Sequence, residues 1–211
     1  MYRLLIAGAG GVTSYLLPVL LKTFKISNIT LVDKDVLEER NLDRQQFNVD
    51  AIGKPKAEAL SKMFWDYTKF DVKIEWLTTN TDCRGYDLLI CACDNHKARR
   101  DILTISDMER IPAIIGGNEY IDSEAYMYLP KWRDTEKDPR IYYPDILLDN
   151  YGSPLNCTGE LQEVFPQLAM ANMSCASHIL HLMWNLFKSK ADIELRPYRR
   201  STKEYKNESF I

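Results

Sequence analysis

The stretch GAGGVTS at Gly8–Ser14, together with LVDKD at Leu31–Asp35, decides the fold class of this chain. A short apolar run, Leu4–Ala7, leads directly into the glycine turn, and an amphipathic segment begins at about Val12. Strand, glycine turn and helix in this order are typical of a nucleotide site, because bare glycine backbone lets N–H groups approach a phosphate at a helix N-terminus. Since the glycine turn alone is a weak signal, the polar residues that follow it must indicate which nucleotide binds.

The composition favours a single globular domain in a reducing compartment. The chain has 211 residues, 45% of them hydrophobic, which suffices for a full core. The net charge of −3 argues against nucleic acid and anionic membranes as partners, and no apolar run approaches the ~20 residues that cross a bilayer. Gly8, Gly10 and Gly11 interrupt the apolar start where a signal peptide would be continuous. Five cysteines without a CxxC pair argue against a disulfide framework or a zinc site. We therefore expect a cytoplasmic protein.

Alternating strand and helix patterns predict a Rossmann-like α/β fold. The predicted strands are Tyr2–Ala7, Asn28–Val32, Lys73–Leu77, Leu88–Ala92, Ala113–Gly116 and Glu124–Leu129. The predicted helices are Val12–Phe24, Lys56–Tyr67, Lys97–Met108 and Pro166–Phe187. This alternation predicts a mostly parallel sheet with helices on both faces. Because a short connection joins the last two strands, we expect the C-terminal strand to be antiparallel.

The whole chain is predicted to consist of one domain, which contains a long loop, and a C-terminal tail. Residues 1–195 are expected to form one nucleotide-binding domain. Within it, residues 130–165 are rich in Pro, Asp, Tyr and Gly and have no period, which predicts a long crossover loop of functional or mobile character. Residues 196–211 contain few aliphatic side chains, so they are predicted to form a flexible tail.

Polar side chains follow the second predicted strand. Asp33 ends that strand, where a carboxylate suits the two hydroxyls of a ribose, although it could also be a turn residue. Asn41, Arg44, Gln45 and Lys56 lie in or just beyond the next loop. Two cations and two amides indicate more negative charge than a dinucleotide brings. They fit a triphosphate attacked at its α-phosphorus, where charge shifts in the transition state, whereas the alternative is a solvated charged loop.

A further carboxylate follows the predicted strand Leu88–Ala92. Asp94 comes at the carboxyl edge of the sheet, where parallel strands bind ligands. A single carboxylate near the glycine turn suits Mg²⁺, with water and phosphate oxygens as the other ligands. Alternatively, Asp94 or the adjacent Asn95 caps the helix that starts near His96.

The order of the motifs resembles that of the ThiF/MoeB/HesA adenylyltransferases, within the ubiquitin-activating enzyme superfamily. The matching motifs are GAGG, DKD with Asn41, Arg44 and Gln45, GKPKAEA at Gly53–Ala59, and CDN at Cys93–Asn95. The resemblance extends over residues 2–130 and implies ATP and Mg²⁺ as cofactors. It further implies adenylation of the C-terminal carboxylate of a small ubiquitin-like or sulfur-carrier protein that ends in Gly-Gly, by an enzyme that is commonly a homodimer.

The resemblance also implies a role for each site residue. Gly8, Gly10 and Gly11 would approach the phosphates, Asp33 would hold the ribose, Asn41, Arg44, Gln45 and Lys56 the triphosphate, and Asp94 the Mg²⁺. The partner's carboxylate would attack the α-phosphorus and expel pyrophosphate. It needs no general base because it is already ionised at neutral pH. The catalytic work of Arg44, Lys56 and Asp94 would then be positioning and charge neutralisation.

Cys157 introduces a possible second step. PLNCTGELQEVFP at Pro154–Pro166 is similar to the segment around the catalytic cysteine of ubiquitin-activating enzymes. The similarity implies that the Cys157 thiolate takes the acyl group from AMP as a thioester. The spacing between CT and FP is longer than in the family, and members that stop at adenylation lack this cysteine, so both outcomes stay open. Cys91, Cys93 and Cys175 are expected to be core residues.

Two departures from the family pattern leave other functions open. Thr13 replaces the last glycine of the turn. Because the first predicted strand begins at Tyr2, we expect no N-terminal helix that supplies an arginine to a neighbouring subunit. One alternative is an NAD(P)-binding oxidoreductase, which would leave Asn41, Arg44 and Lys56 without a task. The other is a catalytically idle homologue that scaffolds a complex. His178 and His181 could share a helix face as metal ligands, but we expect them to form a packing or dimer surface.

Overall fold

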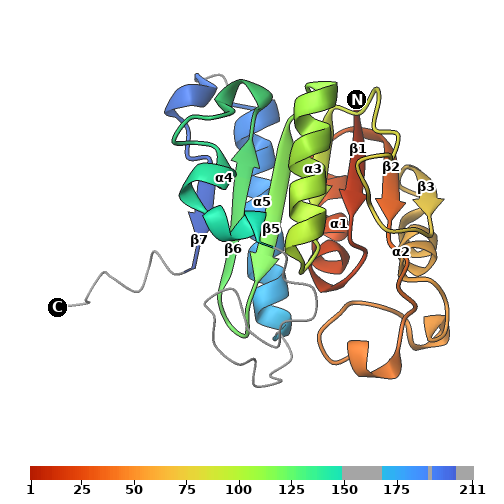
Figure 1. Ribbon diagram of the computed structural model, residues 1–211. Coiled ribbons are helices and arrows are strands. Elements are labelled where there is room, and N and C mark those ends of the chain that lie inside the picture. Colours follow the sequence, from red (N-terminus) through yellow and green to blue (C-terminus); the bar gives the residue numbers. More distant parts are fainter. Residues whose placement is uncertain (149–167, 190–191, 203–211) are drawn as a thin grey trace.

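The computed structural model describes residues 1–148, 168–189 and 192–202 (Figure 1). In these residues one sheet has the strand order β3-β2-β1-β4-β5-β6-β7. The strands are β1 (Tyr2–Ala7), β2 (Ile26–Val32), β3 (Lys69–Lys73), β4 (Leu88–Cys91), β5 (Ala113–Asn118), β6 (Ser123–Tyr128) and β7 (Arg199–Ser201). Strands β1 to β5 pair in parallel, whereas β6 and β7 are antiparallel. This arrangement confirms the predicted Rossmann-like sheet with antiparallel C-terminal strands.

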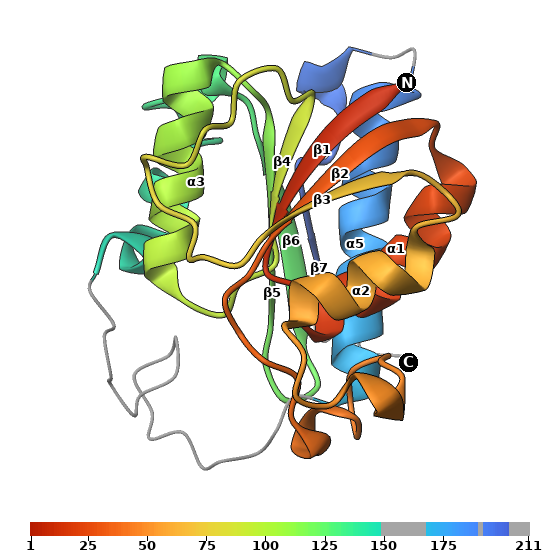
Figure 2. The ribbon, with the colours of Figure 1, turned by 90° about the vertical axis from the view of Figure 1, so that its right-hand side faces the viewer.

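Helices cover both faces of the sheet, as predicted (Figure 2). The α-helices are α1 (Gly11–Thr23), α2 (Lys56–Phe64), α3 (His96–Glu109), α4 (Pro139–Tyr142) and α5 (Ala169–Phe187). The 3-10 helices are η1 (Glu39–Asn41), η2 (Val49–Ala51), η3 (Pro130–Trp132), η4 (Pro144–Leu147) and η5 (Ile193–Leu195). Helix α3 lies on one face, and α1, α2 and α5 lie on the other. Within the described ranges, no helix has the length and apolar character needed to span a membrane.

The central strands β1 and β4 lie in the hydrophobic core. Leu4, Leu5 and Ile6 of β1 have no exposed surface, and all of β4 is buried as well. A parallel strand between two helical layers is covered on both faces, which explains why β1 is a continuous apolar run rather than an alternating one. Strong burial of β1 and β4 fixes the backbone immediately before the turns that build the site.

The third strand differs from the predicted strand Lys73–Leu77. Strand β3 ends where the prediction begins, at Lys73, whose register partner is Val32 of β2. The side chain of Leu77 is buried in the hydrophobic core, so the chain leaves the sheet after Lys73. Of the apolar residues that suggested a strand, only Leu77 turns into the core, whereas Ile74 and Trp76 are exposed.

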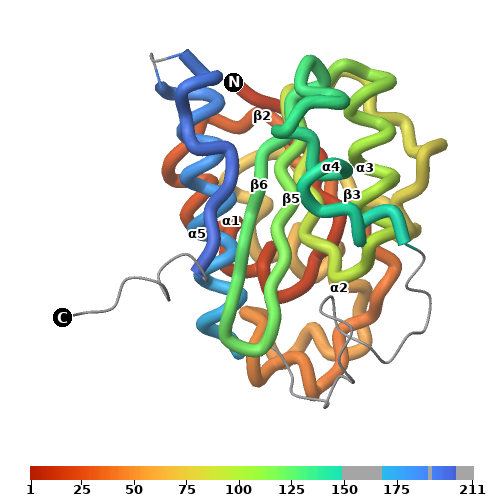
Figure 3. Tube along the Cα trace, turned by 60° about the vertical axis from the view of Figure 1, so that its left-hand side comes forward, coloured from red at the N-terminus to blue at the C-terminus, as the bar shows by residue number. Residues whose placement is uncertain are grey.

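Strand β7 corrects the prediction of a flexible tail from residue 196 onward. Residues Arg199–Ser201 pair with β6, and the flanking backbone bonds run from Met127 N to Tyr198 O (2.7 Å) and from Thr202 N to Ser123 O (2.9 Å). Figure 3 shows this last segment beside the β5–β6 hairpin. The unpaired edge of β6 offers a row of backbone donors and acceptors, and pairing with it requires few aliphatic side chains.

The first part of the predicted long loop contains short helices and a buried polar cluster. The Arg140 guanidinium bonds to Asp107 Oδ2 (2.8 Å), Asp138 Oδ1 (2.9 Å) and the Tyr128 hydroxyl (2.6 Å). Burial by itself would raise the pKa of Asp138, but hydrogen bonds from Arg140 and from the Asp134 backbone hold that pKa below its usual value. The cluster attaches α4 to α3 and β6. Residues 149–167, which include the rest of the predicted loop, lie outside the described residues.

We expect Arg140→Leu to destabilise the fold by roughly 3 kcal/mol, because it leaves the buried Asp138 carboxylate without its cation and leaves Asp107 with only the exposed Arg133. Thermal unfolding should show a melting temperature lower by roughly 6 to 12 °C. Arg133→Leu is the matched control. It removes a cation from the same Asp107, but its side chain is 58% exposed, so the expected loss is about 0 to 1 kcal/mol.

The effect of Arg140→Leu should also depend on pH. The folded state lowers the pKa of Asp138, so the stabilisation is present above the usual aspartate pKa and is lost as the pH falls through the lowered value. The stability difference between wild type and Arg140→Leu should therefore shrink in acid. Equal melting temperatures for the two leucine variants at neutral pH would contradict this account of the cluster.

Candidate functional site

A cavity of about 550 Å³ lies at the carboxyl ends of the parallel strands. Each of these strands contributes to its lining: Gly8 follows β1, Asp33 follows β2, Trp76 follows β3, Asp94 follows β4 and Asn118 ends β5. Between β1 and β4 the connections leave in opposite directions. This is where open α/β sheets bind ligands, because the loops diverge and leave a crevice.

The glycine turn approaches its neighbours too closely for side chains. Gly8 has a φ of +94°, and a Cβ there would lie 2.7 Å from the Ala92 carbonyl oxygen. A Cβ on Gly11 would lie 2.4 Å from the amide nitrogen of Asn172. Thr13, the departure from the family turn, is fully buried, and its hydroxyl donates to Gly8 O at 2.5 Å. The threonine therefore bonds to the backbone of the turn itself.

Asp33 is held rigidly at the edge of the cavity. Its Oδ2 accepts from Ala9 N (2.6 Å) and its Oδ1 from Asp35 N (2.7 Å). Burial raises the pKa of Asp33, although these two backbone donors act in the opposite direction. Each carboxylate oxygen has a second lone pair. Asp33 can therefore accept hydrogen bonds from a diol in the cavity while it keeps its bonds to the turn.

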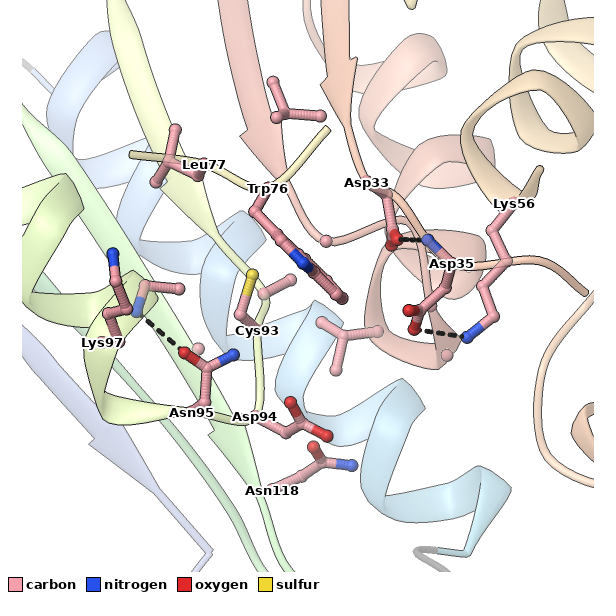
Figure 4. Close-up of a pocket in the computed structure, with 18 of the residues that line it drawn as sticks. Asp33, Asp35, Lys56, Trp76, Leu77, Cys93, Asp94, Asn95, Lys97 and Asn118 are labelled. Atoms are coloured by element: carbon pink, nitrogen blue, oxygen red, sulfur yellow. Dashed lines mark hydrogen bonds and ion pairs between the residues drawn. The ribbon is translucent and has the colours of Figure 1, made fainter. Parts of the chain in front are cut away.

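Two more of the expected site residues line the cavity beside Asp33. Lys56 Nζ lies 3.1 Å from Asp35 Oδ2, and this ion pair is drawn in Figure 4. The Lys56 side chain is only 11% exposed, so its charge is concentrated at the cavity. Gln45 also lines the cavity, and its buried Oε1 has no hydrogen-bond partner among the described residues. A buried amide oxygen without a partner is costly, which suits a position that a ligand completes.

Asp94 is exposed and projects at the carboxyl end of β4 (Figure 4). Asn95, and not Asp94, caps α3, because Asn95 Oδ1 accepts from Ala98 N at 2.9 Å. Asp94 makes no hydrogen bond or ion pair with any residue that the structure describes. Within those residues no group of three or more His, Cys, Asp or Glu gathers as a metal site. A cation at Asp94 would therefore take most of its ligands from phosphate and water, as Mg²⁺ does.

Asn41 and Arg44 are placed differently from the expectation. The Asn41 side chain is buried and accepts from Glu38 N at 3.0 Å, so it caps the short η1 helix. The Arg44 guanidinium donates to Arg40 O (2.8 Å) and to Asp43 Oδ1 (2.7 Å). Neither residue is among those that line the cavity. Their predicted contacts with a triphosphate would need the loop to rearrange.

The sequence analysis did not identify several lining residues, among them Asn118, Asn172 and Trp76. Asn172, on α5, donates from Nδ2 to Arg44 O (3.0 Å) and accepts at Oδ1 from Asn118 Nδ2 (2.8 Å). Asn118 ends a parallel strand, so its position at the carboxyl edge was a usable signal. Asn172 is a buried polar residue on a mostly apolar helix, and Trp76 was assigned to a strand. Only the tertiary structure brings these two to the site.

The cysteines divide into core and site residues. Cys91 and Cys175 are fully buried, which confirms the expectation. Cys93 was expected in the core, but it is only partly buried and lines the cavity, because β4 ends at Cys91. Cys157 lies outside the described residues. His178 is partly buried on α5, while His181 Nδ1 lies 2.9 Å from Ser177 O.

A family model agrees with this geometry over most of the chain. The model of the ThiF family matches residues 1–197. The chain belongs to the ThiF family. One curated relative is the SAMP-activating enzyme E1 of Haloferax volcanii, which is 27% identical over 136 residues. That match covers 61% of this chain and 50% of the relative, so the chain spans about half the length of this ThiF-like relative.

Solved structures share the fold of this ThiF-family chain. The E. coli tRNA N6-threonylcarbamoyladenosine dehydratase TcdA matches with a TM-score of 0.63 and 21% identity, over 85% of this chain and 83% of TcdA. A TcdA structure in complex with ATP matches with a TM-score of 0.64, 21% identity and coverage of 90% and 88%. PaaA matches with a TM-score of 0.65 and 19% identity, over 88% of this chain and 64% of PaaA. At these identities the likeness establishes the fold alone.

We expect Gly11→Ala to destabilise the protein by about 1 to 3 kcal/mol, because the new methyl group would overlap the buried Asn172 amide. Asn172 cannot easily move away, since it bonds to both Asn118 and Arg44 O. The measurement is chemical denaturation. Gly10→Ala is the matched control, because its Cβ would meet nothing closer than Gln45 Nε2 at 3.9 Å. An equal loss in both variants would show that Asn172 does not constrain the turn.

Proposed function

We propose that this chain uses ATP to adenylate the C-terminal carboxylate of a small ubiquitin-like or sulfur-carrier protein. The observation that carries the proposal is the convergence of Asp33, Lys56 and Asp94 on one cavity at the β1/β4 divergence. Membership in the ThiF family supports it, as do a relative named as a SAMP-activating enzyme and a neighbour solved with ATP. We further propose that residues 1–195 form one adenylation domain.

In this proposal the residues bind ATP along the crevice. Asp33 accepts hydrogen bonds from the ribose hydroxyls, and the Gly8–Gly11 backbone approaches the phosphates at the N-terminus of α1. Lys56, directed by Asp35, supplies a positive charge to the phosphate chain, and Gln45 supplies an amide. Asp94 would hold Mg²⁺, which when bound neutralises phosphate charge.

The chemical step needs positioning more than proton transfer. The partner's carboxylate is ionised at neutral pH and attacks the α-phosphorus directly. The bond from the α-phosphorus to the bridging oxygen breaks, and pyrophosphate leaves with the electron pair. Lys56 is placed to offset charge that moves onto the leaving group. Arg44 would join it only if its loop turned the guanidinium toward the cavity, as would Asn41.

The partner and the assembly are also proposals. The partner would be a small protein with a Gly-Gly tail, as the family resemblance implies. The exposed side chains of Met170, Met173 and Trp184 on α5 support a homodimer, because they leave apolar surface uncovered on that helix. Family membership argues against the oxidoreductase alternative, whereas a catalytically idle homologue is distinguished by the assays below.

We expect ATP with Mg²⁺ at 100 times its dissociation constant to stabilise the wild-type protein by about 2.7 kcal/mol. That corresponds to a rise in melting temperature of roughly 5 to 10 °C. Asp94→Asn should reduce this shift to the level seen with ATP and a chelator. It should also lower ATP–pyrophosphate exchange, measured with a Gly-Gly-ending ubiquitin-like protein, on the order of 100-fold.

Asp82→Asn is the control, because Asp82 is also exposed but does not line the cavity. Undiminished exchange in Asp94→Asn would refute the metal assignment. A shift with NAD⁺ alone would favour the oxidoreductase. ATP binding without exchange for any such partner would favour the idle homologue.

We also propose that Cys157 accepts the acyl group from the adenylate as a thioester. The thiolate would attack the acyl carbon, and AMP would leave with the bonding electrons. The expected product is an adduct with the carrier protein that a thiol reagent cleaves. Cys157→Ala should abolish this adduct while exchange persists, and Cys83→Ala, which changes a buried thiol outside the cavity lining, should leave it intact. An adduct that survives Cys157→Ala would reject the thioester.

A further inference from the structure

The cavity has two chemically different walls. One wall is polar and contains Asp33, Gln45 and Lys56. The other side contains Trp76, Leu77, Ala92, Cys93 and Ala98, which present carbon and sulfur, together with the polar residues Asn95 and Lys97. A nucleotide has the same division, since its phosphates and ribose are polar and its base is a flat aromatic ring.

Trp76 dominates the apolar wall. Its side chain belongs to the segment after β3 that the sequence pattern had assigned to a strand. Trp76 is 57% exposed, and its indole lies between Asp33 and Cys93 in the close-up (Figure 4). It makes no hydrogen bond or ring contact with any residue in the described ranges. A large aromatic surface that faces a cavity without a partner is available to a ligand.

The backbone on both sides of Trp76 is fixed. Before it, Asp33 N donates to Lys73 O at 3.1 Å, which attaches the end of β3 to the turn after β2. After it, Leu77 is buried in the core, and Thr81 N donates to Thr78 O at 2.9 Å in the turn that follows. The indole is therefore presented at a set distance from the Asp33 carboxylate by a short segment that is anchored at each end.

The other tryptophans are not comparable. Trp132 is 3% exposed, and its indole nitrogen donates to Glu194. Trp65 and Trp184 are exposed, but they lie on the ends of α2 and α5 and do not line the cavity. Trp76 is thus the tryptophan whose open ring face is directed at the site.

We propose that Trp76 is the residue that stacks on the purine base of the nucleotide. This inference rests on the proposed function, because it takes Asp33 as the ribose ligand. With the phosphates at the glycine turn and the ribose at Asp33, the base continues toward the apolar wall. Stacking on an aromatic side chain accepts any base with a sufficient π-surface. Trp76 therefore contributes to the affinity for any flat aromatic base. Purine nucleotides should gain more binding free energy from this stacking than pyrimidine nucleotides, because their ring system is larger.

The test compares a nucleotide with a ligand that has no base. Calorimetry measures the affinity of wild type, Trp76→Ala, Trp76→Phe and Trp65→Ala for Mg²⁺–ATP and for Mg²⁺–tripolyphosphate. We expect Trp76→Ala to weaken ATP binding about 5- to 150-fold and to leave tripolyphosphate binding unchanged. Trp76→Phe retains a ring and should stay within about threefold of wild type. Trp65→Ala is the matched control and should bind both ligands normally.

Fluorescence provides a second measurement that does not depend on the alanine variant. In a Trp65→Phe/Trp184→Phe background, Trp76 and the buried Trp132 remain as emitters. ATP should quench the emission, and tripolyphosphate should not. Adding Trp76→Phe should remove the quenching by ATP.

The outcomes separate this inference from the proposed function. If wild type binds neither ATP nor tripolyphosphate, the proposed function fails, and the role of Trp76 fails with it. If wild type binds ATP and Trp76→Ala binds it equally well, only the stacking role is overturned. Quenching that persists in Trp76→Phe, or equal losses of ATP and tripolyphosphate affinity in Trp76→Ala, would also overturn it.

Discussion

The turn after β1 contacts the end of β4 and helix α5 through backbone that carries no side chain. This close approach fixes the distance between the segments that line the cavity. Gly8 lies against the Ala92 carbonyl, and Gly11 lies against the Asn172 amide. A side chain at either position would separate these segments. Thr13 stabilises the arrangement from within, because its hydroxyl donates a hydrogen bond to the Gly8 carbonyl. The threonine variant of the family turn thus preserves the close contact.

Asn172 extends this constraint across the molecule. Its amide joins β5, through Asn118, to the loop that carries Arg44 and Gln45. One buried side chain therefore connects the sheet, the last helix and the loop beside the phosphate turn. Both of its hydrogen bonds are made in a site of low solvent access, where a lost partner is costly. Movement of the Arg44 loop toward a bound triphosphate would have to preserve or replace the bond to Arg44 O.

Charge is distributed unevenly around the cavity. Lys56 is nearly buried and paired with Asp35, whereas Asp94 is exposed and makes no ion pair with the described residues. The buried cation is already oriented, while the exposed carboxylate remains free to take a hydrated metal ion. Such a division suits a reaction in which the protein positions a polyanion and the bound metal ion keeps part of its hydration shell. The apolar wall around Trp76 then provides for the uncharged end of the same ligand.

The sequence by itself determined the fold class, the alternation of strands and helices and the general place of the site. Apolar runs, a glycine turn and carboxylates directly after strands are local features, and they predicted β1, α1 and β4. Asp33, Lys56 and Asp94 line the cavity, while their roles there stay predictions. Only the tertiary structure decided the rest. Asn172 and Trp76 reach the cavity through contacts between distant segments. The side chains of Asn41 and Arg44 form hydrogen bonds within their own loop. Strand β7 forms because the edge of β6 has free backbone donors and acceptors. A local sequence pattern indicates the secondary structure and the chemistry of a residue. Its contact partners depend on how distant segments pack in the folded chain.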